Sequence, residues 1–129
     1  CHWPGIYYNG EELGFDIFKT VVTRLEEKYD HLIWMTLSEI ADYWAARQYS
    51  SYRVAGKTIE IMAPFAAQLF TLQIPENMIP AYLTFEGQDD HFTEVHSLDG
   101  LTKDMYYRSA SGNTVCFDLP LGTTLLTMR

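Results

Sequence analysis

The chain has 129 residues, of which 47% are hydrophobic, a size and composition that suit one folded domain or one domain with a remnant of another. Its net charge is −8 and its nine Lys and Arg residues are scattered, which disfavours a nucleic-acid partner and an anionic membrane surface. No apolar run approaches the roughly 20 residues of a membrane span. These residues show no signal-peptide pattern, and the compartment is left open, an extracytoplasmic one included.

The first ten residues, CHWPGIYYNG, are unusual for a chain terminus because they carry no Met and gather His and aromatic side chains. We interpret them as the end of a β-strand and its loop, cut from a larger enzyme. His2 would lie where the strand ends, the edge that carries catalytic side chains in α/β barrels. A histidine there can act as a general acid or base near neutral pH. The alternative is that His2 is a plain terminal residue.

A helix is predicted to follow, over residues 9–29. Asn9 and Glu12 have the spacing of a capping pair at its start. Five apolar residues recur at the spacing of one buried helical stripe, namely Phe18, Val21, Val22, Leu25 and Tyr29.

Residues 31–35, HLIWM, form a short apolar run that predicts a buried strand, and a second helix follows. Thr36 and Glu39 match the capping box T-x-x-E at the start of this helix. Its predicted buried stripe consists of Leu37, Ile40, Ala41 and Trp44. Two helices and one or two strands are too little to bury both stripes, so we expect these helices to pack on the rest of the chain or on another chain.

After about residue 50 the sequence changes to short alternating segments separated by Gly, Pro, Asn or Asp. The segments "SYRVAGKTIEIMAP", "QLFTLQIP", "AYLTFEG", "FTEVHSL", "MYYRSA", "TVCFDLP" and "TTLLTM" predict strands, and "SGN" near 111–113 predicts a hairpin turn. The predicted fold class is therefore α+β: a short α/β remnant over residues 1–50, followed by an antiparallel Ig-like β-sandwich over residues 51–129. The boundary is placed at Ser50–Ser51.

Other chemistry-bearing residues point to no site. His91 and His96 are five apart, which would put them on opposite faces of a regular strand, so we predict no metal site there. Cys1 and Cys116 could form one bridge, although two free thiols are favoured.

Residues 1–45 resemble the C-terminal end of polysaccharide deacetylases of the NodB-like family. The resemblance is carried by "CHWPG", the helix after it, and "YDHLIWMTLSEIADYW", in which "MTLSEI" matches a phrase of the family. It implies a parent with a distorted (β/α) barrel that removes acetyl groups from polysaccharides and holds a divalent metal, often zinc. By position, His2 would be the general acid, and Trp3, Tyr7 and Tyr8 would line the substrate groove.

The family's other motifs, which supply the base, the metal ligands and the groove arginine, do not occur in these residues. The resemblance therefore implies a fragment that is inactive by itself, with no metal or other cofactor of its own. Its expected partners are a polysaccharide or oligosaccharide, and the rest of its parent chain or another subunit.

Two alternatives stay open. The chain could be a non-enzymatic carbohydrate-binding or protein-interaction module that presents Tyr82, Phe92, Tyr106 and Tyr107 on its sandwich, although their alternation with polar neighbours favours core packing. It could also be a purely structural β-domain that stabilises the barrel. The polymer, the position of the acetyl group, the metal and the oligomeric state cannot be predicted from these residues.

Overall fold

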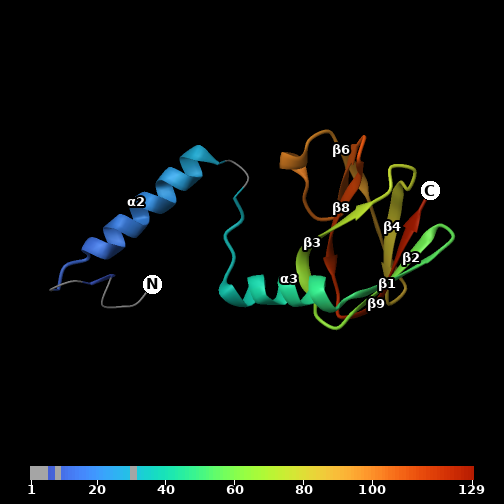
Figure 1. Ribbon diagram of the computed structural model, residues 1–129, viewed down its shortest axis with the longest axis horizontal. Helices are drawn as coiled ribbons and strands as arrows, with labels where there is room; N and C mark the ends of the chain where they lie inside the picture. Colours follow the sequence, from blue (N-terminus) through green and yellow to red (C-terminus); the bar gives the residue numbers. More distant parts are fainter. Residues whose placement is uncertain (1–5, 8–9, 30–31) are drawn as a thin grey trace. The chain divides into compact units, whose positions relative to one another are not determined.

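The computed structural model describes residues 6–7, 10–29 and 32–129. The chain divides into two compact units, Cys1–Trp34 and Met35–Arg129, and each unit is described by itself (Figure 1). The composition change at Ser50–Ser51 lies inside the second unit, where a helix ends and a strand begins.

The first unit contains one described helix, α2 (Leu13–Lys28). The predicted start is wrong: the helix begins after Glu12, whose side chain makes no capping hydrogen bond, and Asn9 lies outside the described residues. Its apolar stripe is also not buried, since α2 has no buried residue and Phe18 is 54% exposed. Periodicity selected the apolar face correctly, but the described part of this unit does not cover that face.

The strand predicted at residues 31–35 is absent over Leu32–Met35, and His31 lies outside the described residues. All four side chains are exposed. The indole Nε1 of Trp34 donates to the Glu26 carboxylate at 3.1 Å. An apolar run becomes a strand only when a neighbouring strand accepts its backbone hydrogen bonds, and the described residues provide none here.

The second unit opens with α3 (Leu37–Tyr49), whose start confirms the predicted capping box. The Glu39 backbone N–H donates to the Thr36 hydroxyl, and the Thr36 backbone N–H donates to the Glu39 carboxylate. The predicted buried stripe is wrong, however, because Leu37 is 86% exposed and Ala46 is the buried residue of the helix. Tyr43 and Ala46, on the opposite side of the helix, belong to the face that joins the core.

Nine described strands form two sheets. The five-stranded sheet has the order β1 (Ser51–Ala55), β2 (Thr58–Ala63), β9 (Gly122–Met128), β4 (Pro80–Phe85) and β5 (Gln88–His91). The four-stranded sheet has the order β3 (Ala67–Ile74), β8 (Gly112–Leu119), β7 (Met105–Ser109) and β6 (Thr93–Val95), and a short 3₁₀ helix, η1 (Leu98–Gly100), follows β6. With two helices, the described chain is a sheet-rich α+β fold (Figure 1). No helix of the described residues is long and apolar enough to span a membrane.

Both sheets contribute to one hydrophobic core, as the alternating pattern predicts. β2 and β8 supply every second residue to it, so Ile59 and Ile61 come from one sheet and Val115 and Phe117 from the other. The Phe117 ring lies 5.9 Å from that of Phe70 between centroids. This shared core makes residues 51–129 the packed part of the chain.

The two sheets differ from the prediction in pairing. β6 pairs with β7 in parallel, so the four-stranded sheet is mixed rather than purely antiparallel. The connection through η1 carries the chain back to the other end of the sheet, which is what a parallel neighbour requires.

β5 was missed because Gln88–His91 is polar and resembles a separator. Glu86 and Gly87, both with positive φ, form the two-residue hairpin turn before it. All of β5 is exposed at the edge of its sheet, where polar side chains are tolerated on both faces.

A buried amide fixes the loop after β3. Asn113, on β8, is fully buried, and its Nδ2 donates to the carbonyls of Met78 at 2.7 Å and Glu76 at 3.2 Å. Those carbonyls belong to the loop between β3 and β4, which pairs with no described strand. Asn113 therefore ties the β3–β4 connection to the centre of the four-stranded sheet.

Candidate functional site

The residues predicted to carry catalysis fall mostly outside the described residues. His2, Trp3 and Tyr8 are not described, and Tyr7 is half-buried. The assignment of His2 as general acid, with Trp3, Tyr7 and Tyr8 lining a groove, stays a prediction.

The two remaining candidate ligands do not share a strand. His91 ends β5 in one sheet, and His96 follows β6 in the other, because the chain changes sheets at the buried Phe92. Within residues 6–7, 10–29 and 32–129, no three His, Cys, Asp or Glu side chains come together as a metal site.

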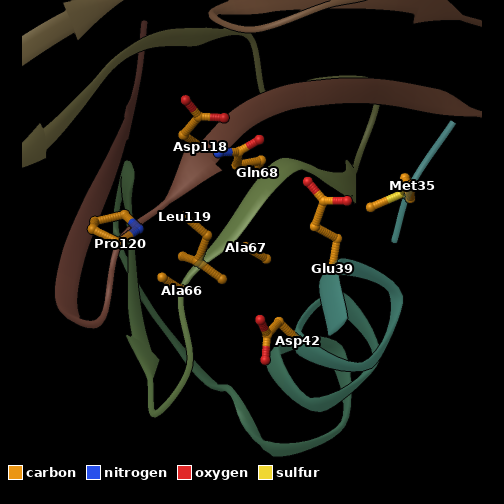
Figure 2. A pocket seen from close by; sticks show the side chains of 9 residues that line it. All are labelled: Met35, Glu39, Asp42, Ala66, Ala67, Gln68, Asp118, Leu119 and Pro120. Atoms are coloured by element: carbon orange, nitrogen blue, oxygen red, sulfur yellow. The ribbon is translucent and has the colours of Figure 1, made fainter. Parts of the chain in front are cut away.

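Two hollows in the second unit involve α3. The first, the acidic pocket, has a volume of about 390 Å³ and lies against β3 and the end of β8. Figure 2 shows Glu39 and Asp42 of α3 on one side of it and Asp118 and Leu119 of β8 on the other. Met35, Ala66, Ala67, Gln68 and Pro120 complete the lining.

Two of the three carboxylates in the acidic pocket already have structural partners. Glu39 closes the capping box, and the Thr36 backbone N–H, followed by the Thr36 hydroxyl, holds the pKa of this carboxyl below its usual range. Asp118 accepts from the Leu69 backbone N–H at 3.0 Å and lies 3.2 Å from the Lys103 ammonium. A general acid needs a raised pKa, so the direction at Glu39 does not favour this one carboxyl as a proton donor.

The second hollow, the tyrosine cleft, has a volume of about 590 Å³. Its lining comes from α3, from β1 and from β3 and β8 of the other sheet: Tyr43, Arg47, Tyr52, Phe70, Thr71, Leu72, Gln73 and Thr114. β1 and β3 are edge strands of their respective sheets, so the cleft lies where α3 meets one open side of the fold. It combines aromatic rings with hydroxyl, amide and guanidinium groups, the mixture that small-molecule sites use.

Cys116 offers no nucleophile. It is a buried free thiol on β8, and burial, followed by the charges of Asp118 and Asp104, raises its pKa to about 11. At neutral pH it is a neutral side chain that contributes packing. The free Cys116 agrees with the favoured prediction of free thiols, and Cys1 lies outside the described residues.

The binding-module alternative needs four exposed aromatic side chains, and two of them pack in the core instead, the role favoured for these residues. Phe92 and Tyr106 are buried in the core, and Tyr106 also donates from its hydroxyl to the Glu94 carboxylate at 2.9 Å. Tyr82 and Tyr107 are half-buried, and the Tyr82 ring lies 5.7 Å from the His91 ring. These four residues therefore do not form one exposed platform.

The residues that line the tyrosine cleft were not singled out from the sequence, because they come from four elements and share no motif. In comparisons with protein-family models, curated proteins and solved structures, no match was found. The case for a site therefore rests on the geometry of the chain itself.

Proposed function

We propose that the chain is the C-terminal part of a polysaccharide deacetylase-like protein, with the end of a (β/α) barrel over residues 1–50 and an Ig-like β-sandwich over residues 51–129. The sandwich acts as an accessory domain, and the chain is inactive by itself. The parent would remove acetyl groups from a polysaccharide with a divalent metal, zinc being usual, held by residues outside this chain.

The observation that carries the proposal is the contrast between the two faces of α3. One face packs through Tyr43 and Ala46 on the sheets. The opposite face presents Leu37, Ile40 and Trp44 to solvent. A helix in a barrel wall buries such a stripe against the barrel strands, so α3 has one face for the sheets and one for a barrel.

The stripe of α2 supports the same proposal. Phe18 and Val21 are exposed in the described structure, although their spacing is that of a buried face. Exposed apolar stripes of this size mark surfaces that contact another part of a protein. In the proposed parent that part is the barrel, and His2 acts as general acid at its active edge.

The test starts from the native polypeptide that carries these residues, detected in source cells with an antibody raised against the chain. We expect a band far above the size of 129 residues, and acetate release from an acetylated polysaccharide by the purified protein. His2→Ala should lower that rate at least about a hundredfold, since a positioned acid contributes on this scale. His96→Ala, a matched change at an exposed loop position, should leave the rate unchanged.

Two results would overturn the proposal. One is a native band at the size of these residues. The other is acetate release that His2→Ala does not alter, which would remove the assigned role of this histidine.

A further inference from the structure

The tyrosine cleft has a rigid aromatic wall. The Tyr43 hydroxyl is hydrogen-bonded to the Thr71 hydroxyl at 2.9 Å and accepts from the Thr71 backbone N–H at 3.3 Å. Its ring lies 5.5 Å from the Phe70 ring between centroids. Contacts at both the ring and the hydroxyl hold Tyr43 in one orientation before any ligand arrives, which lowers the entropic cost of binding.

A second ring completes the wall. Tyr52 pairs across the strands with Ile61, a fully buried residue, so its side chain lies on the core side of the five-stranded sheet. β1 is the edge of that sheet, however, and Tyr52 stays 43% exposed. Burial, followed by the nearby Tyr43, raises the pKa of Tyr52, as expected for two phenols that share one hollow.

The cleft carries one formal charge. Arg47 is the single ionisable cation in its lining, and no carboxylate lines it. No ion pair involves Arg47 within the described residues. In a chain of net charge −8, the cleft therefore offers hydrogen-bond donors to an acceptor oxygen.

We propose that the tyrosine cleft is a binding site for a sugar polymer that carries no positive charge. The rings of Tyr43 and Tyr52 contact the C–H faces of sugar rings, and Arg47 donates to a hydroxyl, acetamide or carboxylate oxygen. Gln73 and Thr114 bind ring hydroxyls. The choice of a sugar polymer rests on the function proposed above. The residues proposed to bind it differ from those proposed for deacetylation.

The geometry favours a sugar over a peptide. A peptide that adds to a sheet edge needs free backbone groups on that edge. The backbone N–H of Thr71, at the centre of β3, already donates to the Tyr43 hydroxyl of α3 at 3.3 Å. A peptide strand would therefore have to displace Tyr43 to pair with the centre of β3.

The experiment titrates the 129-residue chain with three hexasaccharides, followed by calorimetry and by amide chemical shifts. The probes are an N-acetylglucosamine hexamer, a neutral glucose hexamer and a galacturonic acid hexamer. We expect at least one to bind with a dissociation constant on the order of 1 mM or tighter, with shifts at Thr71, Gln73 and Thr114. Binding of the uronate alone would identify a carboxylate as the oxygen bound by Arg47.

The variants locate the site. Tyr52→Ala should weaken binding at least about fivefold, as expected for a central aromatic contact, and Gln73→Ala, at an exposed position, tests the same cleft if Tyr52→Ala does not fold. Tyr82→Ala, on the five-stranded sheet away from the cleft, should have no effect. No binding of any hexamer, or binding that neither cleft variant weakens, would overturn the proposal.

This test is independent of the proposed deacetylase activity, because it measures binding without chemistry. Loss of acetate release in the parent would leave the binding result standing. Absence of binding would leave a deacetylase with an accessory domain that does not touch its substrate.

Discussion

The sheets of this chain bury their apolar stripes, whereas the two described helices leave theirs largely exposed. Leu126 on β9 is fully buried, whereas Leu37 on α3 is 86% exposed. Both residues lie on the apolar stripe that periodicity assigns to their element. The sheets bury their stripe because each sheet faces the other, and the described residues contain no second layer for the stripes of α2 and α3.

An apolar stripe therefore indicates which face of an element would be buried, but it does not show that a surface is present to cover that face. In residues 51–129 the chain supplies both faces of the core. For the exposed stripes of α2 and α3, the described residues supply the helix face but no surface that packs against it. Substitutions at buried and at exposed apolar positions measure this difference.

Leu126→Ala should lower the free energy of unfolding by about 2–5 kcal/mol, because it removes a fully buried side chain and leaves a cavity. Urea unfolding followed by circular dichroism and tyrosine fluorescence measures the change. A cost under about 1 kcal/mol would mean that the core is far looser than described.

Asn113→Ala should cost about 1–3 kcal/mol, since it leaves the Met78 and Glu76 carbonyls without their donor. The same urea experiment applies. Hydrogen exchange should show the loss of protection centred on the loop between β3 and β4. An even loss over both sheets would contradict the assignment of Asn113 as a loop clamp.

Thr36→Ala should destabilise α3 by about 1 kcal/mol, the usual contribution of an N-cap hydroxyl. Thr23→Ala, in the middle of α2, is the matched control without a cap. Amide exchange at the first turn of α3 measures the effect, and equal exchange in both variants would show that the cap contributes nothing.

The capping box also predicts a pH dependence. Hydrogen bonds from Thr36 lower the folded-state pKa of Glu39 below its usual value of 4.5. The stabilisation is therefore complete above about pH 5 and is lost as the pH falls through the folded-state pKa. Glu39→Gln should reduce the loss of α3 helicity that follows when the pH falls below about 5. If the variant lost helicity as much as the unsubstituted chain, Glu39 would not be the group responsible for the pH dependence.

Leu37→Ala should change the free energy of unfolding by no more than about 0.5 kcal/mol, because the side chain is already exposed. It is the matched partner of Leu126→Ala, with the same chemical change at the other extreme of burial. In the proposed parent the same substitution should cost more, since a barrel would bury Leu37. Equal costs in the two proteins would mean that no further layer covers α3.

Much of the fold could be predicted where the signal is local. The hairpin at "SGN" joins β7 and β8, and the alternating segments after residue 65 coincide with β3, β4, β6, β7, β8 and β9. The capping box of Thr36 and Glu39 was predicted from four residues. Each signal depends on side chains that interact within one element or one turn.

The errors come from interactions between elements. Leu32–Met35 is composed like a strand, but no described strand pairs with it and it forms none. β5 is composed like a loop, but β4 pairs with it and it forms a strand. The binding-module alternative needs Phe92 and Tyr106 on the surface, but both are buried in the core, the role that alternation favours for them. Periodicity cannot distinguish the first two cases, because it contains no information on what lies across from a side chain.

The spacing of residues along one element is enough to predict where strands alternate, where α3 begins and which residues form apolar stripes. The tertiary structure alone decided which stripe is buried, and it placed Tyr43 of α3 beside Thr71 of β3. The tyrosine cleft exists because two edge strands and a helix meet, and residues so far apart in the chain carry no shared pattern. Burial depends on a partner surface, and only the folded chain shows whether that surface is present.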